Sequence, residues 1–141
     1  MGIAAIANEI VEEFELFGDD WDGKYEHLID LGKSLPLIDA QCKTDDRLIN
    51  GCQSSVWLHS ELNADKIIFT ADTDAIITKG IVALLIRVIS GHTTDEIINA
   101  PFGFINQIGL MEHLSPNRSN GLVSMIKQMK LDAIGYQQFK L

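Results

Sequence analysis

Apolar residues recur at steps of three and four along the first quarter of the chain, with acidic residues between them. This period is typical of an amphipathic helix, and it predicts a helix from Ile3 that ends near Gly18. A second helix is predicted from about Trp21 to Gly32, where the apolar period stops. The stretch 38–46 has no clear period and is expected to be a surface connection.

In the middle of the chain the pattern changes to short apolar runs broken by turn residues, which favours strands. Residues 48–49 lead into an Asn-Gly pair at 50–51, which readily takes the positive φ angles of a tight turn. Strands are predicted at 54–62 and 66–71, joined by a turn at 63–65. The pattern therefore predicts an antiparallel meander.

Segment 75–90 is apolar on most faces, which predicts a core helix that covers one side of the sheet. The sequence at 93–96 matches a capping box and predicts a short helix that ends at Pro101. The region 103–109 shows no regular pattern and is expected to be irregular. Ser115-Pro116 supplies an N-cap and a first-turn proline for a last helix with one apolar stripe.

The composition agrees with an ordered globular chain. Of 141 residues, 46% are hydrophobic and 22% are charged, and there are neither repeats nor a low-complexity linker. We therefore expect one α+β domain spanning residues 1–141.

The charge balance excludes some partners. Twenty acidic residues against eleven basic ones give a net charge of −9, which repels nucleic acid and anionic lipid. The longest uncharged apolar run, 80–86, is far shorter than the ~20 residues of a membrane span. The N-terminus lacks the features of a signal peptide, and two cysteines are too few for a secreted disulfide framework. We expect a cytoplasmic protein that binds neither nucleic acid nor membranes.

Cys52 is the candidate reactive residue. It directly follows the predicted tight turn, and a nucleophilic cysteine must be accessible and deprotonated, which free N–H groups of a turn favour. A single cysteine near a strand end is, however, more often a buried small apolar side chain. This position by itself leaves both interpretations open.

Longer motifs around and after Cys52 bear on the choice between these two interpretations. They are Gly51-Cys52-Gln53-Ser54 with Val56-Trp57, then Asp72-Thr73-Asp74-Ala75, Lys79-Gly80 and the run from His113 through Asn117-Arg118 to Leu122. In this order they resemble the motifs of the SufE family of sulfur-transfer proteins, and the resemblance extends over most of the chain.

The resemblance implies a fold like that of iron–sulfur scaffold proteins, with helices packed on a three-stranded antiparallel sheet. It implies that Cys52, flanked by Gly51 and Gln53, accepts a persulfide sulfur from a cysteine desulfurase of the SufS or CsdA type. The chain would activate that enzyme and pass the sulfur to a cluster scaffold or another acceptor. Pyridoxal phosphate would belong to the desulfurase, so no cofactor is expected here, and the chain would not be a stand-alone enzyme. A homodimer stays open.

Two further residues have two interpretations each. Asp74 either caps the helix that follows or, by the resemblance, affects the segment that carries Cys52. Arg118 is either a surface charge at a helix start, where the dipole disfavours a cation, or lies beside Cys52.

The alternative function is a metal or iron–sulfur cluster scaffold that uses Cys42, Cys52 and Asp74. We favour an incidental role for Cys42, because a bridge to Cys52 requires Cα atoms within ~7 Å. The sequence shows no clustered cysteines and histidines, so no metal site is expected.

Overall fold

The computed structural model describes residues 2–49 and 54–138. Gly51, Cys52 and Gln53 lie outside the described residues. The fold is α+β, as predicted, with a three-stranded antiparallel sheet in the order β1-β2-β3. The strands are β1 (Val56–Asn63), β2 (Lys66–Thr73) and β3 (His92–Thr93). The helices are α1 (Ile3–Glu15), α2 (Trp21–Gly32), α3 (Ile76–Ile89), α4 (Thr94–Ile98), α5 (Gly103–Gln107), α6 (Leu110–His113) and α7 (Pro116–Gln138).

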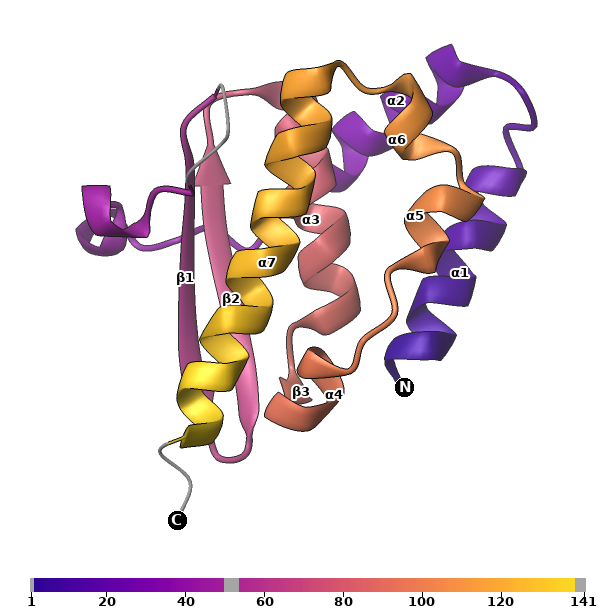
Figure 1. Ribbon diagram of the computed structural model, residues 1–141. Coiled ribbons are helices and arrows are strands. Elements are labelled where there is room, and N and C mark those ends of the chain that lie inside the picture. Colours follow the sequence, from indigo (N-terminus) through magenta and orange to yellow (C-terminus); the bar gives the residue numbers. More distant parts are fainter. Residues whose placement is uncertain (1, 50–53, 139–141) are drawn as a thin grey trace.

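The helices lie on one side of the sheet in two layers (Figure 1). α3 and α7 pack next to the strands, and α1 and α2 lie on the far side of α3. Among the described residues, no helix combines the length and the apolar character that crossing a membrane requires.

β1 and β2 form the predicted hairpin. Their register runs from Val56 opposite Thr73 to Asn63 opposite Lys66, and Ala64 in the turn has a positive φ of 57°. Alternate side chains are buried along β2 and in the first half of β1, which is the period of a sheet with one covered face. β3 is only two residues long and pairs with the start of β2.

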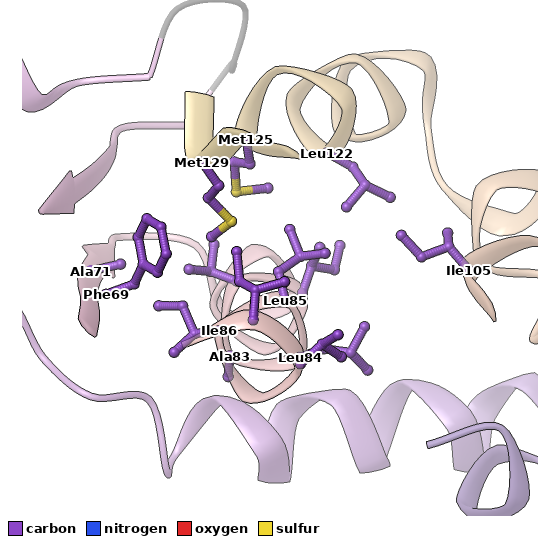
Figure 2. Close-up of a cluster of buried hydrophobic side chains, with 14 of the residues drawn as sticks. Phe69, Ala71, Ala83, Leu84, Leu85, Ile86, Ile105, Leu122, Met125 and Met129 are labelled. Atoms are coloured by element: carbon purple, nitrogen blue, oxygen red, sulfur yellow. The ribbon is translucent and has the colours of Figure 1, made fainter. Parts of the chain in front are cut away.

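α3 is the centre of the core, as its apolar pattern predicted. Figure 2 shows its side chains directed toward both the sheet and α7. Leu84 and Leu85 are fully buried. The neighbours labelled in Figure 2 are Phe69 and Ala71 of β2, Leu122, Met125 and Met129 of α7, and Ile105 of α5. A helix that is apolar on most faces is stable in water only when neighbouring elements bury it on several sides.

α2 and α3 approach each other at two glycines. A Cβ atom added to Gly80 would lie 2.1 Å from the carbonyl oxygen of Leu28, and one added to Gly32 would lie 3.0 Å from the backbone nitrogen of Gly80. Real Cβ contacts are never as short as the first of these distances. The crossing of the two helices therefore requires a glycine at position 80.

Two regions differ from the sequence expectation. The connection expected at 38–46 contains two 3₁₀ turns, which span Ala40–Cys42 and Asp45–Arg47. The region 103–109, expected to be irregular, contains α5, and the short helix α6 follows directly after it. Helices of four and five residues are too short to show a period in sequence, and they are stabilised by burial of side chains such as Phe104 and Leu110.

The predicted caps of the later helices are confirmed. Thr93 and Glu96 form a reciprocal capping box at α4. At α7 the Ser115 hydroxyl accepts a hydrogen bond from the backbone N–H of Arg118 at 3.3 Å.

Glu13 of α1 connects this helix to α2 and α3. Its carboxylate accepts a 3.0 Å hydrogen bond from the Arg87 guanidinium of α3 and lies 3.1 Å from Nε2 of His27 in α2. The hydrogen bonds from Arg87 lower the pKa of Glu13, although burial acts in the opposite direction. The acidic side of α1 is thus partly a packing surface rather than only a solvated one.

The lowered pKa of Glu13 predicts a pH dependence of stability. A carboxyl group whose pKa is lower in the folded state stabilises the fold above its unfolded pKa, and this contribution is lost as the pH falls through the folded pKa. We expect Arg87→Met to lower the free energy of unfolding on the order of 1 kcal/mol at pH 7. The difference from the wild type should shrink below about pH 4. Urea unfolding at both pH values measures this, and a difference that persists in acid would contradict it.

Candidate functional site

The flanks of Cys52 are the residues on either side of the segment that carries it, namely 48–49 and 54–57. They are paired with each other in antiparallel fashion. Leu48 forms a bridge with Trp57, and the Ile49 N–H donates a 2.9 Å hydrogen bond to the Val56 carbonyl. Gly51, Cys52 and Gln53 themselves lie outside the described residues. The pairing agrees with the sequence expectation of two extended segments, while the turn expected at residues 50–51 lies outside the described residues.

A small pocket lies beside one of these flanks. Its volume is about 110 Å³, and it opens between Ser54, the first turns of α3 and the first turns of α7. Ser54 is two residues after Cys52 in the sequence. The residues that line the pocket are Ser54, Thr78, Ile81, Asn117, Arg118, Gly121 and Met125.

Arg118 is therefore next to the flank of Cys52, which the sequence left as one of two interpretations. It lies in the first turn of α7, a helix of 23 residues. The N-terminus of a helix carries partial positive charge from its free N–H groups, and the Arg118 guanidinium adds a full one. The potential at this end of the pocket favours an anion, and a thiolate or a persulfide is such an anion.

Asp74 does not cap α3, so that interpretation is wrong. The N-cap residue is Ala75, and it has no side-chain capping bond. The Thr73 hydroxyl accepts from the Ala75 N–H at 3.4 Å instead. The helix begins at Ile76, one residue too late for Asp74 to occupy the capping position. Asp74 is exposed in the bend between β2 and α3 and is not among the residues that line the small pocket.

A cluster that sequence reasoning missed lies on the uncovered face of the sheet, close to the same flanks. The Lys43 ammonium is 2.9 Å from Oδ2 of Asp72 and lies 4.5 Å above the ring of Trp57. Burial raises the pKa of Asp72, but the hydrogen bonds from Lys43 and from the Thr73 N–H outweigh it, so the net shift is downward. We call Lys43, Trp57 and Asp72 the Lys43 cluster.

Trp57 is only half-buried. Its side chain lies on the other face of β1 from the buried side chains of Val56 and Leu58, and so faces away from the helices. No local signal in the sequence relates it to Lys43 and Asp72. Only the pairing of Trp57 with Asp72 across the hairpin places these residues together.

The scaffold alternative can be compared with the described part of the chain. Cys42 is a half-buried free thiol in a 3₁₀ turn. Within residues 2–49 and 54–138, no three His, Cys, Asp or Glu side chains gather closely enough to hold a metal ion. The described residues therefore add no support to a metal site built on Cys42 and Asp74.

A larger polar pocket of about 330 Å³ lies at the edge of β1, between the 3₁₀ turn of Arg47 and the last turns of α7. Asp132 of α7 accepts hydrogen bonds there from Ser60 at 3.2 Å and from Gln128 at 2.8 Å. Burial raises the pKa of Asp132. The Tyr136 hydroxyl donates to the Ser60 carbonyl at 2.7 Å. This network joins the C-terminal half of α7 to β1.

Comparison with a solved structure agrees with the observed fold. The solution structure of a hypothetical protein from Thermus thermophilus has a TM-score of 0.78 with this chain, over 94% of this chain and 96% of the other. The two are 17% identical, so this likeness concerns the fold alone.

Sequence comparisons extend across the flanks of Cys52. Residues 8–133 match the model of the SufE family, which is described as an Fe-S metabolism associated domain. An uncharacterized SufE-like protein of Rhizobium meliloti is 36% identical over 133 residues, which cover 91% of this chain and 94% of the relative. A SufE-like protein of Arabidopsis thaliana, described as chloroplastic/mitochondrial, is 37% identical over 89% of this chain, which corresponds to 34% of that longer protein. Since the matched region includes nearly every described element, the chain belongs to the SufE family, whose domain is associated with iron–sulfur metabolism.

Proposed function

We propose that this protein accepts sulfur on Cys52 from a pyridoxal-phosphate-dependent cysteine desulfurase, activates that enzyme, and delivers the sulfur to iron–sulfur cluster assembly. The observation that carries the proposal is the family match over residues 8–133, which includes the Gly51-Cys52-Gln53-Ser54 motif. Pyridoxal phosphate belongs to the desulfurase in this proposal. The chain, one domain over residues 1–141, supplies the thiol and its surroundings, so it is an accessory protein rather than a stand-alone enzyme.

The proposed step is a thiol–persulfide exchange. The Cys52 thiolate attacks the outer sulfur of the desulfurase persulfide, and a new sulfur–sulfur bond forms at Cys52. The sulfur–sulfur bond of the desulfurase breaks, and its cysteine leaves as a thiolate. The proton stays on the transferred sulfur, so the exchange consumes no oxidant and no reductant.

The pocket beside Ser54 supports this chemistry. The attacking thiolate is an anion, and the persulfide becomes one when its outer sulfur later gives up the proton to solvent. Arg118 with the N-terminus of α7 favours negative charge near the flank of Cys52. Ile81 and Met125 form an apolar side of the same pocket. The positive end of the pocket is the part that favours a thiolate or a persulfide anion.

Mass measurement tests the proposal. The protein is incubated with a cysteine desulfurase and cysteine, and the intact chain is weighed. We expect the mass of one added sulfur atom, removable by a reducing thiol. A chain without added sulfur that instead holds stoichiometric zinc, or absorbs visible light after aerobic purification, would support the scaffold alternative.

Arg118→Ala tests the role of the pocket. We expect persulfide loading to slow by roughly tenfold, because one charge-assisted interaction with the reacting anion is lost. The melting temperature should change little, since Arg118 is exposed. Loading is followed by mass spectrometry and stability by circular dichroism.

Lys127→Ala is the matched control for Arg118→Ala, because it removes a positive charge from an exposed position of the same helix. It should load at the wild-type rate. Asp74→Ala is expected to act in the opposite direction and speed loading, because the family resemblance implies that Asp74 affects the segment that carries Cys52 and its loss would make the thiol more accessible. Equal loading by the wild type and both site variants would return Arg118 and Asp74 to ordinary surface residues.

A further inference from the structure

The segment that leads to Cys52 crosses the uncovered face of the sheet before it reaches β1. Its first part is paired with β2, where the Ile38 N–H donates a 3.0 Å hydrogen bond to the Ala71 carbonyl. Its last part is paired with β1 through Leu48 and Trp57. Between these two attachments lies Lys43, whose side chain makes the contacts of the Lys43 cluster.

The Lys43 cluster joins three parts of the chain. Lys43 belongs to the segment before Cys52, Trp57 belongs to the flank after it, and Asp72 lies opposite Trp57 on β2. One ammonium group thus binds the carboxylate at 2.9 Å and covers the indole ring at 4.5 Å. The contact attaches the segment before Cys52 to the hairpin of β1 and β2.

This ion pair is less exposed than a fully solvated surface pair. The side chains of Lys43 and Asp72 are 36% and 23% exposed, so solvent screens them only in part. Asp72 is oriented by a second hydrogen bond, from the Thr73 N–H at 2.8 Å. A cation above an indole ring adds to the attraction when it is partly desolvated. Two independent contacts therefore define the position of the Lys43 ammonium.

A second cation lies near Asp72. Lys79 of α3 lies 4.0 Å from the other carboxylate oxygen of Asp72. If Lys43 loses its charge, Asp72 still has a cation nearby and is not left as an isolated, partly buried anion. Removal of the Lys43 charge should therefore change the attachment of the segment much more than the global stability.

We propose that Lys43 is a positioning residue for sulfur transfer, acting through Trp57 and Asp72 on the segment that carries Cys52. This inference rests on the proposed function of Cys52. Displacement of one sulfur by another requires an aligned approach, and small misplacements of a reacting group cost large factors in rate. Lys43 touches no reacting atom in this proposal. Its contribution is to restrict the directions from which Cys52 meets the desulfurase persulfide.

The test uses Lys43→Met in a Cys42→Ser background, in which Cys52 is the only thiol of the chain. We expect the single-turnover rate of sulfur transfer at saturating desulfurase to fall by about tenfold. The half-saturating concentration of desulfurase should change by less than about twofold, since Lys43 is proposed to act on the alignment of Cys52 and not on binding of the enzyme. Alkylation of Cys52 by iodoacetamide should become several-fold faster, because the small reagent needs no alignment and the residues before Cys52 have lost the contact of Lys43 with Asp72 and Trp57.

Three further variants make the test specific. Lys43→Arg should restore transfer, because a guanidinium can both pair with Asp72 and lie on Trp57. Asp72→Asn should reproduce Lys43→Met, and the double variant should lose no more than either single one. Lys33→Met is the matched control, since Lys33 also pairs with an aspartate, Asp30 at 3.3 Å, but on an exposed part of α2.

The two directions of change separate positioning from a general loss of structure. Slower transfer with faster alkylation, at an unchanged melting temperature, supports the proposal. Wild-type transfer and alkylation rates in Lys43→Met would overturn it, as would additive losses in the double variant. If Lys43→Met proves too unstable to assay, Lys43→Gln and Asp72→Asn give the same comparison. A wild-type chain that takes up no sulfur would refute the proposed function itself, a result distinct from a variant that loads normally.

Discussion

Cys52→Ser is expected to fold like the wild type and to accept no sulfur. A hydroxyl is close to a thiol in size, so the change leaves little to repack. It cannot form a nucleophile comparable to a thiolate at neutral pH, and it cannot hold a persulfide. We therefore expect loading below detection by intact mass and loss of desulfurase stimulation, with a melting temperature close to that of the wild type.

Cys42→Ser is the matched control for this experiment, because it makes the same chemical change at the second thiol of the chain. The proposed exchange requires one thiol, so Cys42→Ser should load at close to the wild-type rate. Retained stimulation by Cys52→Ser would refute the proposed function. Loss of loading in Cys42→Ser would show instead that both thiols take part.

Gly80→Ala is expected to cause the largest loss of stability. Its new methyl group would lie 2.1 Å from the Leu28 carbonyl oxygen, which is backbone and cannot rotate away. The change gains about 1 kcal/mol in helix propensity, but it must push α2 from α3, and overpacking on this scale outweighs that gain. We expect a net loss of about 3 kcal/mol or more in the free energy of unfolding, measured by urea denaturation.

Gly135→Ala provides the control. Gly135 also lies inside a helix, and a Cβ atom at this position would meet no atom within 4 Å. The same substitution should therefore be neutral or stabilise α7 by up to about 1 kcal/mol. Similar stabilities of the two variants would show that the contact between α2 and α3 yields more easily than the distance implies.

The sequence by itself determined the long and strongly patterned elements. Helices with many turns, such as α3 and α7, repeat their apolar positions often enough to be recognised without tertiary information. The hairpin of β1 and β2 follows from alternation and turn residues, and the caps of α4 and α7 follow from local side-chain chemistry. The family was likewise evident from motifs that occur in order along the chain.

Only the tertiary structure decided β3, α5 and α6 and the contacts between distant residues. β3 has two residues and forms because α3 returns the chain to the edge of β2, where a ladder is available. α5 and α6 depend on burial rather than on propensity, and a sequence pattern needs several turns to report burial.

The surroundings of Cys52 show the same division. The sequence pointed to Arg118 and Asp74 as functional candidates, and the structure places only Arg118 on the pocket beside Ser54. Asp74 lost its predicted capping role because the start of a helix can shift by one residue without a change in pattern. Lys43 was not recognised, since its partner Asp72 is 29 positions away in the chain. A hydrophobic pattern records which residues are buried, but the pairing of individual charges depends on the register of the hairpin and on the path of the connecting segment, which exist only in the folded chain.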